Sequence, residues 1–331
     1  MITRLRKYTM PAITLLLFLL LGAGCSFEID YDRYAVVYGV GEYVASRELD
    51  EYPNLPYSAG DAGEVSALLA GQGYAVTTRT DTDAVKVNLL ADLAAAAAAV
   101  TEDDLFLFYY AGHGGQVSSL QGTENEGSGS LDEWIFLHGS IYYAGGNVDD
   151  PASYPMDPNL TVNDDLLAAE LRKIHCHKKV VILDACHSGG FIGDSPETDG
   201  LPPAYDGDED GWFSSLGGAI SVYANFDDEE CDIPPDLALV IAAAGEQEVA
   251  WTGGLGPHHV LTYFLLETPW YGDKNGDGYV TVTEAYDYIR NGIEDYWNSY
   301  WNPAATPIEA EWIFAPHVSG GPLDYLLFEA R

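Results

Sequence analysis

Two glycine-rich stretches each follow an apolar run and carry a side chain suited to nucleophilic catalysis. AGHGG, at 111 to 115, places His113 directly after one such run, and DACHSGG, at 184 to 190, places Cys186 after another. A cysteine attacks as its thiolate, and a histidine within reach can take the thiol proton. The surrounding glycines leave room for backbone N–H groups to approach an oxyanion. The two motifs therefore predict a Cys–His dyad, whereas a lone cysteine would more often be a small buried hydrophobe.

The elements that must position this dyad alternate along the chain. Apolar, β-branched runs predict strands, and apolar positions at helical spacing predict helices between them. Since strands that alternate with helices form parallel sheets, the carboxyl ends of the two motif strands are expected at one edge. The predicted class is α/β, with a mostly parallel twisted sheet and helices on both faces; the strands are expected at 34 to 40, 74 to 78, 104 to 110, 134 to 137, 180 to 183 and 237 to 244, and the helices at 58 to 70, 85 to 100, 164 to 174, 256 to 267 and from about 284 to 297.

Composition limits the class of partner. The 331 residues are 47% hydrophobic, which is sufficient for a substantial core, and the net charge is −38. Nucleic acid is excluded as a partner, because binding its phosphates requires clustered Lys and Arg. The charge itself is explained by a solvated surface, with calcium affinity or attraction of basic substrates as alternatives.

The N-terminus has the pattern of a signal peptide at 1 to 24. Basic residues precede an apolar run at 13 to 21, which is too short to span a bilayer, and small residues precede Cys25. This arrangement resembles the lipobox of bacterial lipoproteins and implies that Cys25 is lipidated. The expectation is an outer-membrane lipoprotein of the bacterial cell envelope with a tether at 25 to 33, or a secreted protein if cleavage occurs without lipidation.

AGHGG and DACHSGG, in this order and each behind an apolar strand, resemble the histidine and cysteine motifs of the caspase and metacaspase-like cysteine peptidases. The resemblance covers roughly 34 to 290 and implies a caspase-like three-layer sandwich for the domain 34 to 331. It implies that Cys186 attacks a peptide carbonyl and that His113 handles the proton of the leaving amine. It also implies that the N–H groups of Gly114 and Cys186 hold the oxyanion.

The resemblance also implies a specificity pocket. Metacaspases have an aspartate two residues before the cysteine, here Asp184, and another near the first helix, here Asp61. In that family such carboxylates accept the Arg or Lys that precedes the scissile bond. The alternatives are a helix cap for Asp61 and a strand-end acceptor for Asp184. Arg47 leaves a preference for acidic residues open.

DKNGDGYVTVTE at 273 to 284 has the spacing of an EF-hand calcium loop, with Gly278 at its turn. The alternative is an acidic turn without calcium. Metacaspases also bind calcium through an aspartate cluster, for which Asp164, Asp165 and Asp194 are weak counterparts. The predicted Ca²⁺ ligands are Asp273, Asn275, Asp277, the Tyr279 carbonyl, Thr281 and Glu284.

Proline and acidic residues mark 191 to 236 as a long loop insertion, and no Lys or Arg occurs from 180 through 273. An enzyme that prefers basic residues therefore cannot cut itself there. A disulfide between Cys176 and Cys231 would leave Cys186 free.

The predicted function is a membrane-anchored, calcium-binding cysteine endopeptidase that cleaves peptide or protein substrates after Arg or Lys. The alternative is a catalytically silent, calcium-stabilised scaffold lipoprotein of the same fold.

Overall fold

The structure, a computed structural model, describes residues 31–44, 53–118, 131–147, 153–186, 188, 239–245, 248–253, 255–300, 313–319 and 325–331. From Asp32 to Arg331 the chain forms one compact unit. The predicted signal peptide, Cys25, the loop insertion at 191 to 236, Arg47, Asp194 and Cys231 lie outside the described residues. Every helix within the described part is too short or too polar to span a bilayer.

A six-stranded sheet forms the centre of the unit, in the order β10-β8-β7-β3-β1-β2. All its strands are parallel except β10, which pairs antiparallel with β8 at one edge. This arrangement confirms the predicted mostly parallel α/β sheet. The strands are β1 (Arg33–Gly39), β2 (Ala75–Thr80), β3 (Leu105–Ala111), β7 (Lys178–Asp184), β8 (Leu239–Ala242) and β10 (His317–Ser319).

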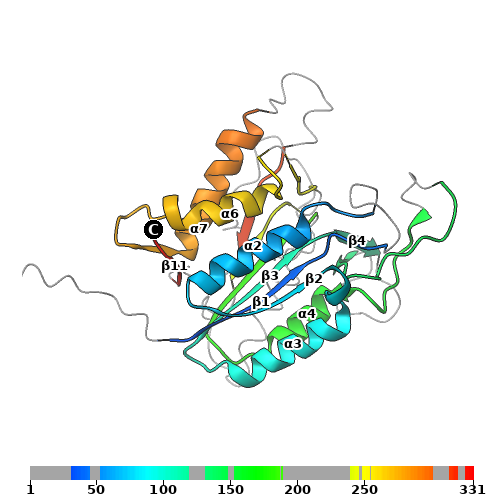
Figure 1. Ribbon diagram of the computed structural model, residues 1–331, viewed down its shortest axis with the longest axis horizontal. Helices are drawn as coiled ribbons and strands as arrows, with labels where there is room; N and C mark the ends of the chain where they lie inside the picture. Colours follow the sequence, from blue (N-terminus) through cyan, green and yellow to red (C-terminus); the bar gives the residue numbers. More distant parts are fainter. Residues whose placement is uncertain are drawn as a thin grey trace, which may run out of the picture. The chain divides into compact units, whose positions relative to one another are not determined.

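Helices cover both faces of this sheet, as predicted. On one side lie α2 (Ser58–Gly71), α6 (Val260–Tyr271) and α7 (Val282–Gly292), and on the other lie α3 (Lys86–Ala99) and α4 (Asp164–Leu171) (Figure 1). The last helix continues as a π-helical segment, Ile293–Asn298, and a short 3₁₀ turn, Asp81–Asp83, precedes α3.

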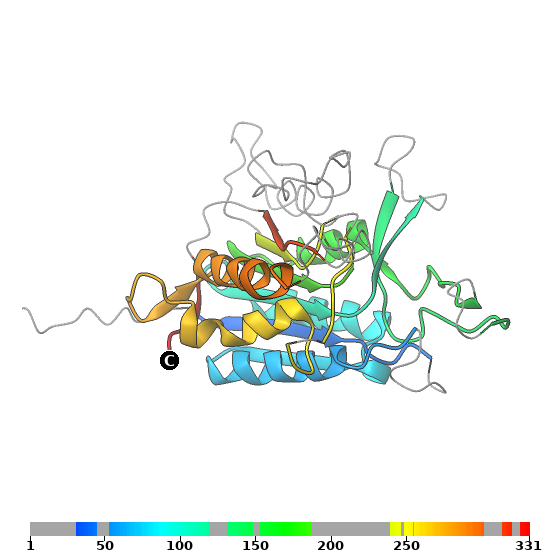
Figure 2. The ribbon, with the colours of Figure 1, turned by 90° about the horizontal axis from the view of Figure 1, so that it is seen from above.

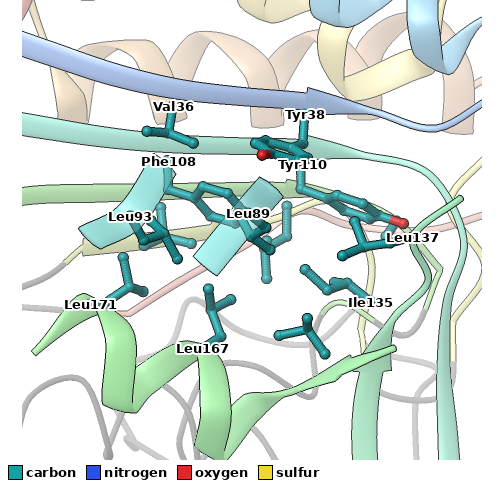
Figure 3. Close-up of a cluster of buried hydrophobic side chains, with 14 of the residues drawn as sticks. Val36, Tyr38, Leu89, Leu93, Phe108, Tyr110, Ile135, Leu137, Leu167 and Leu171 are labelled. Carbon is teal, nitrogen blue, oxygen red and sulfur yellow. The ribbon is translucent and has the colours of Figure 1, made fainter. Parts of the chain in front are cut away.

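The main hydrophobic cluster lies between the sheet and the α3–α4 layer (Figure 3). Alternate side chains of the central strands point into it, as the two-residue period of a strand requires. Leucines spaced four apart on each helix meet them from the other side. The labelled members are Val36, Tyr38, Leu89, Leu93, Phe108, Tyr110, Ile135, Leu137, Leu167 and Leu171, all nearly or fully buried.

Two small sheets complete the unit. The β4–β5 hairpin stands away from the main sheet at the end of β3 (Figure 2), and β6 pairs with β5. A second small sheet joins β9 to the C-terminal strand β11 in antiparallel pairing. Their bounds are β4 (Gly114–Ser118), β5 (Leu131–Ile135), β6 (Val162–Asn163), β9 (Tyr279–Thr281) and β11 (Leu326–Glu329).

Two local predictions are wrong. The helix expected from residue 256 begins at Val260, because Gly256 has a φ of +108° and Pro257 follows it. Asp61 does not cap α2: the N-cap is Tyr57, which forms no side-chain capping bond. The Asp61 carboxylate bonds elsewhere, as described below.

Candidate active site

The register of β3 and β7 brings the two motifs together. Ala111 is paired with Asp184 at the carboxyl ends of these parallel strands, so His113 and Cys186 each lie two residues beyond that pair. The Gly112 N–H donates to the Asp184 carbonyl at 3.2 Å. A Cβ on Gly114 would lie 2.2 Å from the Cys186 carbonyl oxygen, so the two backbones are in direct contact. The residues predicted as dyad and oxyanion hole thus form one cluster.

Two buried tyrosines fix the backbone of His113. The Tyr43 hydroxyl accepts the His113 N–H at 2.6 Å, and its ring lies 4.8 Å from the imidazole between centroids. The Tyr110 hydroxyl donates to the His113 carbonyl at 2.8 Å. A Cβ on Gly112 would lie 2.4 Å from the Tyr110 hydroxyl oxygen and 2.7 Å from that of Tyr43. Glycine is therefore required at this position to admit both hydroxyls.

The His113 ring is oriented by a main-chain carbonyl. Its Nε2 lies 2.6 Å from the Pro53 oxygen in the segment between β1 and α2. A carbonyl only accepts hydrogen bonds, so Nε2 carries a proton, and in the neutral ring Nδ1 is then the basic nitrogen. The Pro53 carbonyl thereby fixes the tautomer in the way a third triad residue would.

Burial favours the neutral form of both dyad residues. It lowers the pKa of His113 to about 4, with the Pro53 carbonyl opposing the shift and the nearby His259 adding to it. Burial also raises the pKa of Cys186 to about 11, and the Cys186 thiol donates to the Ala250 carbonyl at 3.7 Å. At neutral pH the resting pair is a thiol and a neutral imidazole, so the thiol loses its proton when a base takes it during attack.

Sequence reasoning missed three groups of the site. The Pro53 carbonyl leaves no signal, because any residue offers a carbonyl. Tyr43 is far from AGHGG in the sequence, and no pattern of residue spacing connects the two. Ser188 lies within DACHSGG, where its hydroxyl accepts N–H bonds from Ala243 and Ala244 at 3.0 and 3.3 Å and joins the cysteine segment to the end of β8.

Asp61 and Asp184 come together near the dyad, and both are fully buried. The Asp184 Oδ2 accepts the backbone N–H and the hydroxyl of Thr262 at 3.0 and 2.5 Å. The Tyr109 hydroxyl lies 2.5 Å from the same Thr262 oxygen, on the face of β3 opposite the main cluster. The structure thus juxtaposes the two predicted pocket residues and packs the start of α6 against them.

Two histidines at the start of α6 contact these carboxylates. The His258 Nδ1 lies 2.6 Å from Asp61 Oδ1, and the backbone N–H of His259 donates to Asp61 Oδ2 at 2.8 Å. The His259 Nδ1 lies 3.4 Å from Asp184 Oδ1, and its Nε2 lies 3.0 Å from the Ser58 hydroxyl. Burial raises the pKa of Asp61 to about 6, an effect that His259 opposes. The sequence indicates only a helix at 256 to 267, and nothing in it signals these contacts of His258 and His259.

The predicted calcium loop lies between α6 and α7. The Asp273 carboxylate accepts N–H bonds from Gly276, Asp277 and Gly278 at 2.7, 3.2 and 3.0 Å, and Gly278 has a φ of +90°. The Glu284 carboxylate folds back to the Thr281 N–H at 3.0 Å within a capping box that starts α7. The predicted oxygen donors therefore all lie in one loop, which has the turn glycine that an EF-hand needs, and their chemistry fits Ca²⁺.

The remaining candidates stay apart from this site. Asp164 is buried at the start of α4, where Asn163 is the N-cap. Cys176 is buried, and the Cys176 thiol donates to the Lys178 carbonyl at 3.6 Å.

The fold and this strand-end Cys–His pair are those of the caspase-like class of proteins. The profile of the Caspase domain family matches residues 32–268, and the chain belongs to that family. Protein GSU0716 of Geobacter sulfurreducens has a similar structure, with a TM-score of 0.53, 19% identity, and coverage of 90% of this chain and 99% of that one. Caspase-1 from Spodoptera frugiperda gives a TM-score of 0.49 at 11% identity, covering 88% and 90%. No curated protein matches the sequence.

Proposed function

We propose that this caspase-domain protein is a cysteine endopeptidase with Cys186 as nucleophile and His113 as base. The observation that carries the proposal is the β3–β7 register, which sets both residues two positions beyond the Ala111–Asp184 pair. The Pro53 carbonyl supports it, because it leaves Nδ1 as the basic nitrogen.

The reaction follows from these groups. The Cys186 sulfur attacks the peptide carbonyl carbon as His113 takes the thiol proton, and the carbonyl oxygen becomes an oxyanion. The N–H groups of Gly114 and Cys186 stabilise that charge. His113 then gives its proton to the leaving nitrogen as the C–N bond breaks. Water, deprotonated by His113, hydrolyses the resulting thioester and restores the thiol.

Cleavage after Arg or Lys is the proposed specificity, with Asp61 and Asp184 as the recognition groups. Two adjacent buried carboxylates near the nucleophile support it, because a guanidinium or ammonium pairs strongly with carboxylates away from water. His258 and His259 contact these carboxylates in the structure. The substrate cation must therefore displace the His258 side chain, which is 15% exposed, from Asp61.

Calcium is the proposed cofactor, held by Asp273, Asn275, Asp277, the Tyr279 carbonyl, Thr281 and Glu284. The loop hydrogen bonds and the left-handed Gly278 support this proposal. The ion would supply a cross-link between α6 and α7. No catalytic step requires it, so its expected role is to stabilise the folded state by mass action.

The proposed location is the bacterial cell envelope, with the protein lipidated at Cys25 and held to the outer membrane. Support comes from the basic, apolar and small-residue order of residues 1 to 24. Metabolic labelling with a fatty acid analogue tests it: Cys25→Ala should abolish the label. Labelling that persists in that variant contradicts lipidation at this residue.

Peptide reporters ending in Arg, Lys or Asp test the activity. Wild-type protein should cleave the Arg and Lys reporters and leave the Asp reporter, and Cys186→Ala should abolish cleavage. Asp184→Asn and Asp61→Asn should lower kcat/KM for the basic reporters by at least about tenfold, as expected for the loss of a buried ion pair. Absence of cleavage, together with no reaction of Cys186 with thiol-directed peptide inhibitors, would establish the alternative, a silent calcium-stabilised scaffold.

A further inference from the structure

The Asp61 and Asp184 carboxylates and the histidines at the start of α6 form a centre whose geometry differs from that of a simple ion pair. One oxygen of Asp184 and the Nδ1 of His259 are buried, and within the described residues neither has a hydrogen-bond partner. The two atoms face each other at 3.4 Å. Leaving a buried polar atom without a hydrogen-bond partner is unfavourable, so a ligand between these two atoms would be stabilised.

Burial lowers the pKa of His259, but the Asp184 and Asp61 carboxylates outweigh it and raise that pKa, so a proton is the competing occupant of this gap. A protonated His259 would be expected to form a short charge-assisted bond to the carboxylate, about 2.7–2.9 Å long. The observed 3.4 Å instead matches the separation of two ligand atoms on one tetrahedral ion. With metal–ligand bonds of about 2.0–2.1 Å, that separation is about 3.3–3.4 Å.

The surrounding contacts orient the candidate ligands. The Ser58 hydroxyl lies 3.0 Å from His259 Nε2, and when it accepts the Nε2 proton the lone pair stays on Nδ1. Thr262 holds the other oxygen of Asp184, which directs Oδ1 toward the centre. One carboxylate oxygen each of Asp61 and Asp184 and one ring nitrogen of His259 lie within 4.8 Å of one another.

We propose that Asp61, Asp184 and His259 bind a divalent transition-metal ion of the Zn²⁺ type, with a water as the fourth ligand. One imidazole and two carboxylates suit such an ion, whereas Ca²⁺ takes six to eight oxygens and is better served by the loop at 273 to 284. A surface pocket of about 380 Å³ between α2 and α6, lined by His258 with Glu64 and Glu267, lies beside these ligands, because His258 contacts Asp61. The bound ion would occupy both carboxylates that a substrate cation needs, and so would block the proposed basic pocket.

Binding is tested with the full mature chain carrying Cys186→Ala, which removes the dyad thiol as a competing ligand. After treatment with chelator, the protein is titrated with Zn²⁺ by calorimetry and with Co²⁺ by visible absorption, in excess Ca²⁺ to fill the calcium loop. We expect one equivalent of either metal, with the intense Co²⁺ bands of a four-coordinate site and no sulfur-to-metal charge-transfer band.

His259→Gln and Asp184→Asn should each weaken binding at least about tenfold, while His177→Gln should not change it, because His177 lies in an exposed pair with Glu102. Should the two ligand variants fail to fold, X-ray absorption of the Zn²⁺ form of the Cys186→Ala chain decides. Nitrogen and oxygen neighbours with one imidazole support the proposal. Sulfur neighbours, substoichiometric binding, or binding that survives His259→Gln overturn it. The proposal is independent of peptidase activity, since the chain used cannot turn over substrate.

Discussion

At the scale of single residues, the site depends on where protons reside. The Pro53 carbonyl keeps one proton on His113 Nε2, and burial disfavours a second proton on the ring. Burial likewise keeps Cys186 protonated, and the Ala250 carbonyl accepts its thiol hydrogen. The resting site is therefore neutral, and the proposed attack on substrate requires transfer of the thiol proton at the same time.

The half-buried neutral imidazole of His113 predicts a specific loss of stability in acid. The pKa of His113 is about 4 in the folded chain and about 6.5 when unfolded, so between these values the unfolded state binds more protons. Stability therefore falls as pH decreases from about 6.5 to 4, by up to roughly 3 kcal/mol, and by less to the extent that water reaches the ring.

Urea unfolding of wild type and His113→Gln across this range measures the effect. Gln cannot titrate, and its amide can still donate to the Pro53 carbonyl. The difference in unfolding free energy between the two proteins should change steadily over this window, with wild type losing more. If the unfolding free energy of the two proteins has the same pH dependence, the pKa of His113 is not lowered in the folded chain.

The close backbone contact between Gly114 and Cys186 leads to a second prediction at the scale of residues. Gly114→Ala would put a methyl group 2.2 Å from the Cys186 carbonyl, so the two motif segments must separate. We expect kcat/KM to fall by at least about a hundredfold, since misplacement by about 1 Å costs that much.

Gly63→Ala is the matched control for Gly114→Ala. Gly63 is exposed in α2 with no neighbour near its added methyl group, and alanine there should stabilise the chain by about 0.5–1 kcal/mol without changing activity. Equal activity in the two variants would contradict the contact between Gly114 and Cys186.

At the scale of elements, α6 joins the two candidate ligand sites. Its first residues contact the Asp61–Asp184 pair, and the calcium loop follows its last turn. The strand of that loop, β9, pairs with the C-terminal strand β11. Calcium is therefore expected to hold α6, α7 and the chain end together.

Glu284→Gln tests that role of the loop. The variant should lower calcium affinity at least about tenfold and remove the rise in melting temperature that calcium gives the wild type. Glu64→Gln, an exposed carboxylate change on α2, should leave both unchanged. A wild-type melting temperature that is equal with calcium and with chelator would rule out calcium stabilisation.

The elements that could be predicted from sequence are those with a clear periodic pattern. β1, β3, β7 and β8 are apolar runs buried on both faces, and α3 is rich in alanine, so local composition was sufficient. β4 begins with two glycines and β6 has two residues, so they form only through tertiary pairing. In the site, the motif residues were predictable, whereas the Pro53 carbonyl and the His258–His259 contacts depend on the fold.

At the scale of the whole molecule, the distribution of basic residues has a consequence for processing. No Lys or Arg occurs from 180 through 273, which includes the entire segment that follows the nucleophile. An enzyme restricted to Arg and Lys should remain a single chain through this region.

Intact mass and terminal sequencing after prolonged incubation of active protein test this expectation. Any cut should fall outside 180 to 273. A cut within 191 to 236 that is absent from Cys186→Ala would contradict the specificity for basic residues, and leave the catalytic role of Cys186 in place.

The central claim is that Cys186 is the nucleophile and His113 its base, and trapping the acyl-enzyme tests it most directly. Wild type, Cys186→Ala and His113→Ala are mixed with a peptide ester ending in arginine, quenched in acid within seconds, digested and analysed by mass spectrometry. We predict a peptidyl thioester on Cys186 in wild type, none in Cys186→Ala, and formation at least about a hundredfold slower in His113→Ala. An adduct on another residue, or equal rates with and without His113, would contradict the account.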